Sequence, residues 1–178
     1  MWHLRVRLLD SGYEWSYSHL LSIAAVAVAV LVCAHAAADA RAPRPAWTVA
    51  AALLGVLLID NVTRLHEAVP AWPVVYGPVL AALGLAILAA VSGTHGARLA
   101  QLGVVLLGVS FAIHMFERQV LRLFGGDPAS WGWGHHIQVA AKEGIELAGW
   151  VLVVPALAMA SAERAPRARR ASPARRTR

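Results

Sequence analysis

Residues 140–160 read AAKEGIELAGWVLVVPALAMA, and this stretch decides the class of the protein. The part from Trp150 onward is apolar throughout, as expected of a helix that crosses membrane hydrocarbon. The part before it carries Lys142, Glu143 and Glu146, which lipid tails do not solvate. We therefore expect a transmembrane helix whose charged side chains face the interior of a helical bundle.

The composition of the whole chain supports this expectation. Of the 178 residues, 58% are hydrophobic and 15% are charged, whereas soluble domains are about 45–50% apolar and about 25% charged. Apolar runs of about 20 residues, enough to cross the hydrocarbon core, recur along the chain. The sequence predicts an all-α, polytopic bundle of about five transmembrane helices in one domain, residues 1–160. The predicted spans are residues 18–38, 46–67, 72–91, 98–124 and 136–160.

The positive charge is concentrated at the C-terminus. The formal net charge is +6, and seven of the 16 basic residues lie in the last 15 positions. No basic face and no nucleic-acid motif accompanies them, so nucleic acid is excluded as a partner. Residues 161–178 are instead expected to form a disordered, Arg-rich cytoplasmic tail that contacts anionic lipid headgroups.

Arginine placement also predicts the orientation. Five spans place Arg41, Arg44, Arg98 and the tail on one side of the membrane, so the positive-inside rule puts the N-terminus outside and the C-terminus in the cytoplasm. The Ala/Arg-rich, Lys-poor composition suggests a high-GC bacterium, and the expected location is the bacterial inner membrane. One alternative remains open: AHA and ADA resemble cleavage sites, so the first span could be a signal peptide, although cleavage would place the arginine tail outside.

Polar residues in three spans lie at similar depths. At about 1.5 Å per residue, Asp60, His114 and Glu146 lie about 21, 24 and 21 Å from the cytoplasmic boundary. Asp60, Arg64 and Glu67 share one helix face by their i, i+4, i+7 spacing, and Ser110, His114 and Glu117 repeat it. The sequence thus predicts a polar pocket that opens to the outer side. Its expected lining residues are Asp60, Arg64, Glu67, Ser110, His114, Glu117, Lys142, Glu143 and Glu146.

Several functions fit such a pocket, and an enzyme is neither indicated nor excluded. The network could be structural, with Arg64 and Lys142 neutralising the carboxylates, while Gly144 and Gly149 let helices approach closely and Trp150 serves packing. It could bind a small ligand or a lipid, as a homo-oligomer or as a subunit of a larger membrane complex.

The remaining alternative is a metal-dependent hydrolase or oxidase. Asp60, His114 and Glu146 form a one-His, two-carboxylate set that suits a divalent metal such as zinc or iron. No HExxH motif is present. His35 and His114 are poorly placed as a pair of haem ligands.

Three runs carry a resemblance to a known group of proteins: DNVTRLHE at 60–67, HMFE at 114–117 and KEGIELAGW at 142–150. Together they resemble a group of uncharacterised bacterial multi-pass membrane proteins, in which an Asp…His-Glu stretch closes one span and a Glu-Gly stretch opens the last. This resemblance implies no known activity.

A second resemblance is partial. Ser110 and His114 match the Ser-xxx-His element of ceramidase-like membrane hydrolases, whose zinc site also uses an Asp and a His-xxx-His. The last span here has HHIQV instead of His-xxx-His, and two spans are missing.

Overall fold

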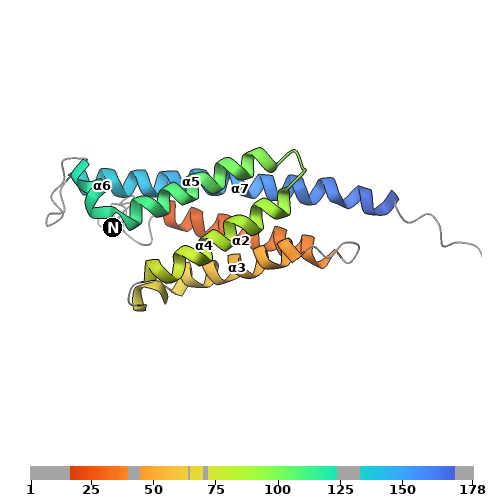
Figure 1. Cartoon of the computed structure of the whole chain (residues 1–178), viewed down its shortest axis with the longest axis horizontal. Helices are drawn as coiled ribbons and strands as arrows, with labels where there is room; N and C mark the ends of the chain where they lie inside the picture. Colours follow the sequence, from red (N-terminus) through yellow and green to blue (C-terminus); the bar gives the residue numbers. More distant parts are fainter. Residues whose placement is uncertain (1–16, 40–44, 64, 70–71, 124–132, 171–178) are drawn as a thin grey trace, which may run out of the picture.

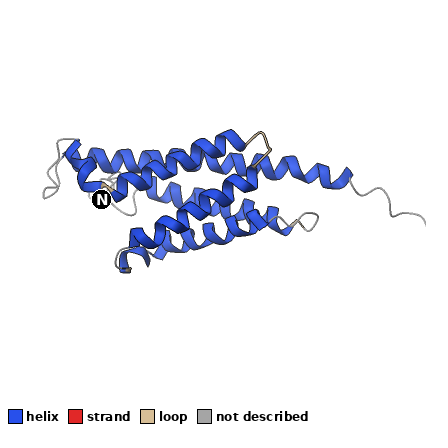
Figure 2. Cartoon of the chain, in the orientation of Figure 1, coloured by secondary structure: helices blue, strands red, loops and turns tan. Residues whose placement is uncertain are grey.

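The computed structural model of the chain describes residues 17–39, 45–63, 65–69, 72–123 and 133–170. These residues form helices joined by short connections, with no strand among them (Figure 2). Five helices are long and apolar enough to cross a membrane, which confirms the predicted fold class. They are α2 (Tyr17–Ala38), α3 (Pro45–Thr63), α4 (Trp72–Val91), α5 (Ala97–Met115) and α7 (Trp133–Arg170).

Two of these helices end earlier than the sequence predicts. α3 stops at Thr63, whose hydroxyl donates a 2.7 Å hydrogen bond to the Ile59 carbonyl, and a 3-10 turn, η1 (Leu65–Ala68), follows. α5 stops before Phe116, whose carbonyl accepts hydrogen bonds from Gln119 and Val120 and so begins α6 (Glu117–Leu123). The 19 residues of α5 already span about 28 Å, so the charged α6 need not enter the hydrocarbon.

The last helix is longer than expected at both ends. α7 has 38 residues, about 57 Å at 1.5 Å per residue, which exceeds the ~30 Å hydrocarbon core. It continues through residues 161–170, which the sequence assigned to a disordered tail, and its end projects beyond the other helices (Figure 1). Residues 171–178 lie outside the described part of the chain.

The five long helices pack in a closed ring. α2 packs against α3 and α7, α4 packs against α3 and α5, and α5 and α7 form the most extensive interface (Figure 1). α4 also contacts α7 across the ring. Because α7 reaches α2, α4 and α5, its polar residues can meet side chains from several helices.

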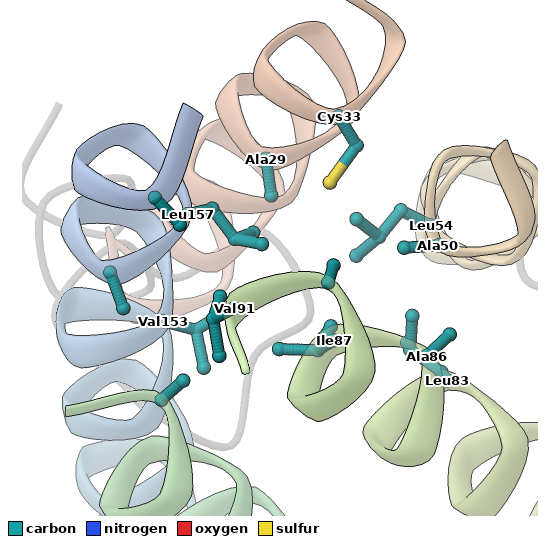
Figure 3. Packing of buried hydrophobic residues seen from close by; sticks show 14 of the residues in the cluster. Ala29, Cys33, Ala50, Leu54, Leu83, Ala86, Ile87, Val91, Val153 and Leu157 are labelled. Carbon is teal, nitrogen blue, oxygen red and sulfur yellow. The ribbon is translucent and has the colours of Figure 1, made fainter. Parts of the chain in front are cut away.

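An apolar core fills one half of the ring. Ile87 and Val91 of α4 lie between Val153 and Leu157 of α7 and the α3 side chains, and Cys33 of α2 closes the cluster (Figure 3). These residues come from the ends of α2, α4 and α7 and from the start of α3, so the core occupies the half nearest the α4–α5 turn. No charged residue belongs to this cluster.

α5 and α7 approach each other through small residues. A Cβ atom added at Gly103 would lie 2.8 Å from the Gly149 carbonyl oxygen, and one added at Gly149 would lie 3.0 Å from the Gly103 carbonyl oxygen. A Cβ atom added at Gly96 would likewise lie 2.6 Å from the Ala156 carbonyl oxygen. The predicted close approach at Gly149 is thus present, whereas Gly144 faces open space.

These contacts repeat every seven residues along both antiparallel helices, which is the spacing of a coiled-coil seam. The next pair in the series is Ser110 and Lys142, where the Ser110 hydroxyl donates a 3.1 Å hydrogen bond to the Lys142 carbonyl. We call this row the α5–α7 seam. It consists of Gly96, Gly103 and Ser110 facing Ala156, Gly149 and Lys142.

Two charged residues of α7 hold the α4–α5 turn. The Arg164 guanidinium donates hydrogen bonds to the Ala90 and Ser92 carbonyls and lies 5.9 Å from the centre of the Trp47 ring. Glu163 accepts a 3.2 Å hydrogen bond from the His95 amide and lies 3.0 Å from His95 Nδ1. A cation meets the carbonyl end of α4 and an anion meets the amide end of α5, as helix dipoles favour.

The seam makes a stability prediction. Replacing Gly103 or Gly149 with alanine puts a methyl group against backbone carbonyl, so each change should lower the free energy of unfolding by about 1–3 kcal/mol. SDS titration of the detergent-purified protein, followed by circular dichroism, measures this. The matched controls are Gly108→Ala on α5 and Gly144→Ala on α7, where a Cβ meets nothing within 4 Å. Equal effects in seam and control variants would contradict the seam.

Candidate functional site

The buried polar residues gather in the half of the bundle opposite the apolar core. They lie near the start of α2 and α7 and near the end of α3 and α5, which all meet at one end of the molecule (Figure 1). The sequence predicted this division for three spans, in which Asp60, His114 and Glu146 and their polar neighbours lie in one half. The buried polar residues are Ser22, Asp60, Ser110, Gln138 and Glu143.

One group of polar side chains lies where α7 meets α2 and α5, and we call it the Glu146 cluster. The Lys142 ammonium pairs with the Glu143 carboxylate at 3.0 Å. The Trp150 indole N–H and the Ser22 hydroxyl of α2 both approach the Glu146 carboxylate. The cluster consists of Ser22, Ser110, Lys142, Glu143, Glu146 and Trp150.

Two buried oxygen atoms on this side of α7 lack a partner. Ser22 Oγ approaches Glu146 without completing a hydrogen bond, and Gln138 Oε1 has no donor among the described residues. Both residues are at most 2% exposed. Gln138 precedes Lys142 by one helical turn on the same face. Because buried polar atoms in proteins are nearly always hydrogen-bonded, two such oxygens beside buried charges point to an additional partner.

A second group lies between α3, α4 and α5. Asp60, which is 3% exposed, forms a side-chain hydrogen bond with Tyr76 of α4. Trp72 packs its ring on His114 with centroids 4.9 Å apart, and it also makes edge contacts with Tyr76 and Phe111. We call Asp60, Trp72, Tyr76, Phe111 and His114 the Trp72 cluster. Its rings fill the space around His114 and Asp60 with aromatic carbon.

The predicted pocket residues therefore divide between two places. Ser110, Lys142, Glu143 and Glu146 come together in the Glu146 cluster, whereas Asp60 and His114 belong to the Trp72 cluster. The break at Phe116 separates Glu117 from the α5 face that it was expected to share with Ser110 and His114. Arg64 lies outside the described residues, as does the side chain of Glu67.

The same division bears on the metal hypothesis. Within the described part of the chain, no three His, Cys, Asp or Glu side chains are grouped as the ligands of a metal ion would be. Asp60, His114 and Glu146 are all described, and they do not form such a group. The geometry thus gives no support to a zinc or iron centre built from these three residues.

Six contributors were absent from the sequence-based set of pocket residues: Ser22, Trp72, Tyr76, Phe111, Gln138 and Trp150. Ser22 and Gln138 do carry a sequence signal, since each is a polar residue in the first half of its span and Gln138 precedes Lys142 by four residues. Tyr76 and Trp72 look like ordinary interfacial aromatics in sequence. Only the packing of α4 against α3 and α5 shows what their rings contact.

Five membrane-length helices in a ring, with an apolar half and a polar half, define a multi-pass helical membrane protein. The chain belongs to the family described as "Domain of unknown function (DUF8692)", whose sequence model matches residues 6–160. Neither a curated protein nor a solved structure matched the chain. The matched segment includes both polar clusters.

The Asp60–Tyr76 contact generates a prediction. In a double-mutant cycle of Asp60→Ala and Tyr76→Phe, the coupling free energy should be about 0.6 kcal/mol, the average for hydrogen bonds between transmembrane helices, and at most about 1.7 kcal/mol. The four unfolding free energies come from SDS titration. Tyr17→Phe, an exposed tyrosine on α2, is the control and should show no coupling with Asp60→Ala. Coupling indistinguishable from zero would mean that this contact does not join α3 to α4.

Proposed function

We propose that this protein is an integral membrane protein that binds a small polar ligand within the bilayer, at the Glu146 cluster. The observation that carries the proposal is the pair of unpartnered buried oxygens, Ser22 Oγ and Gln138 Oε1, beside buried charged groups. An unsatisfied polar group in hydrocarbon costs several kcal/mol, so a ligand or water that meets these atoms is favoured.

The contacts within the cluster argue against a purely structural role. Its ion pair joins Lys142 to Glu143, which are neighbours on one helix, so the pair does not tie α7 to another helix. The contacts that do reach other helices are the Ser110 hydrogen bond and the approach of Ser22 to Glu146. A network that served only to hold helices together would place its opposite charges on different helices.

The placement in the membrane is part of the proposal. The positive-inside rule, applied to Arg41, Arg44, Arg98 and the C-terminal arginines, puts the α4–α5 turn and the end of α7 in the cytoplasm. The Glu146 cluster then faces the outer side of a bacterial inner membrane, and the C-terminal segment meets anionic lipid headgroups. Retention of the first span is supported by the burial of Val26, Ala29 and Cys33 against α3 and α7.

Thiol accessibility tests the binding function. Ser22 and Cys33 lie 11 residues apart on the same face of α2, about 16 Å along the helix, with Ser22 in the polar half and Cys33 in the apolar core. In a Cys33→Ala background, Ser22→Cys should react with a small water-soluble methanethiosulfonate reagent, because a site for a polar ligand must admit water. Native Cys33, the single cysteine of the chain, should remain unmodified.

A second pair of variants controls for position along α7. Gln138→Cys, at a buried position, should be modified, whereas Ile137→Cys, on the outward-facing apolar surface, should not. Labelling is read as a mass shift of the intact protein. If Ser22→Cys is as unreactive as Cys33, the cluster is dry and the binding function is contradicted.

The orientation is tested with fusions of the full chain in a bacterial host. Alkaline phosphatase fused after Arg178 should be inactive, and a fluorescent protein at the same site should fluoresce, because the C-terminus is proposed to be cytoplasmic. Phosphatase inserted in the connection between η1 and α4 should be active. The reverse pattern would place the Glu146 cluster on the cytoplasmic side.

A further inference from the structure

We propose that the ligand of the Glu146 cluster is a small, singly charged metal cation, held between the Glu146 carboxylate of α7 and the Ser22 hydroxyl of α2. This inference rests on the proposed function and adds the chemical class of the ligand. It follows from the charge balance of the cluster, from the kind of donor atoms present and from the partners that each of them already has.

The charge balance leaves one negative charge to be neutralised. Lys142 and Glu143 form a contact ion pair, so together they carry no net charge. Lys142 also acts on Glu146, so one ammonium group is shared by two carboxylates, and the Trp150 indole and the Ser22 hydroxyl that approach Glu146 are both neutral. A carboxylate in hydrocarbon is costly and is usually paired. A cation with one charge completes the neutralisation, and a divalent ion would leave an excess positive charge.

The donor atoms are those that hard cations prefer. Carboxylate and hydroxyl oxygens bind alkali and alkaline-earth ions, whereas thiolate and imidazole ligands select softer metals. Ser22 Oγ is 1% exposed and faces Glu146 with its hydrogen-bonding capacity unused, so its lone pairs are available to a cation. Trp150 N–H only donates, so it orients the Glu146 carboxylate without competing as a ligand.

No other described group on the neighbouring helices replaces the cation. The titratable residues on the elements packed against α7 are Tyr17, His19, Cys33 and His35 on α2, Tyr76 on α4, Arg98 and His114 on α5, and Glu117, Arg118 and Arg122 on α6. Among the described residues, the charges that act on Glu146 are those of Lys142 and Glu143. Tyr76 is engaged with Asp60, and the His114 ring packs on Trp72. No His, Cys, Asp or Glu forms a group of three with the cluster in the described residues, so the high ligand charge that divalent ions require is lacking. The site therefore favours Na⁺ or K⁺ over Mg²⁺ or Ca²⁺.

The experiment measures thermal unfolding of the full-length protein in lipid nanodiscs. NaCl, KCl, MgCl₂ and N-methyl-D-glucamine chloride are compared at equal ionic strength and fixed pH. Na⁺ or K⁺ should raise the unfolding midpoint of the unmodified protein relative to the bulky N-methyl-D-glucamine cation, because a ligand that binds the folded state stabilises it. The more effective ion identifies the physiological cation class.

Three variants locate the effect. Glu146→Gln should lose the midpoint shift, and Ser22→Ala, a mild change that keeps the carboxylate, should move the half-maximal shift to a higher ion concentration. Glu163→Gln, which removes a carboxylate from the same helix but outside the cluster, should keep the full response.

Three results would overturn the proposal: no response to Na⁺ or K⁺, an equal response in Glu146→Gln, or a response to Mg²⁺ alone. If the cation effect is absent while Ser22→Cys is still labelled, the cation is wrong and the proposed binding function stands. If Ser22→Cys is also unreactive, both fail.

Discussion

The close approach of α5 and α7 is the constraint on which the rest of the structure depends. Gly103 and Gly149 each stand where a Cβ would collide with the backbone carbonyl of the other. Hydrophobic burial does not distinguish one helix partner from another in lipid, so such close packing selects the partner. Ser110 lies seven residues after Gly103 on α5, and Lys142 lies seven residues before Gly149 on α7. The same register therefore brings the Ser110 hydroxyl to the Lys142 carbonyl. The seam thus fixes the rotation of α7 and directs Glu146 toward α2.

α7 connects two halves of different chemistry. Toward the α4–α5 turn, Val153 and Leu157 are fully buried in an apolar core. Arg164 stabilises the turn by donating hydrogen bonds to backbone carbonyls of the turn. Toward the other end the same helix presents Glu146 and Lys142. Trp150 lies at the boundary, since it is 3% exposed within the apolar core and its indole N–H approaches Glu146. The apolar half supplies the packing that lets the polar half keep buried charges and unpartnered oxygens.

Much of this arrangement is predictable from the sequence, and particular residues show where prediction fails. The five spans and the polar half follow from hydropathy and from the positions of Asp60, His114 and Glu146. The small residues at 96, 103 and 110 are also visible, although their seven-residue spacing has meaning only once α7 is known to be the partner. The break at Phe116 is not predictable, because HMFE contains neither Gly nor Pro. It removes Glu117 from a face that helical periodicity assigned to it.

The sequence by itself determined the class of the protein and the number of candidate spans, and it predicts a depth for each polar group, because hydrophobic length and rise per residue are local properties of one helix. Only the tertiary structure decided which polar groups meet. Asp60, His114 and Glu146 have matching predicted depths, yet depth does not specify how a helix is rotated or which helix lies beside it. Those choices depend on packing between distant segments. α4 brings Tyr76 and Trp72 to Asp60 and His114, whereas the α5–α7 seam orients α7 so that Glu146 lies beside α2.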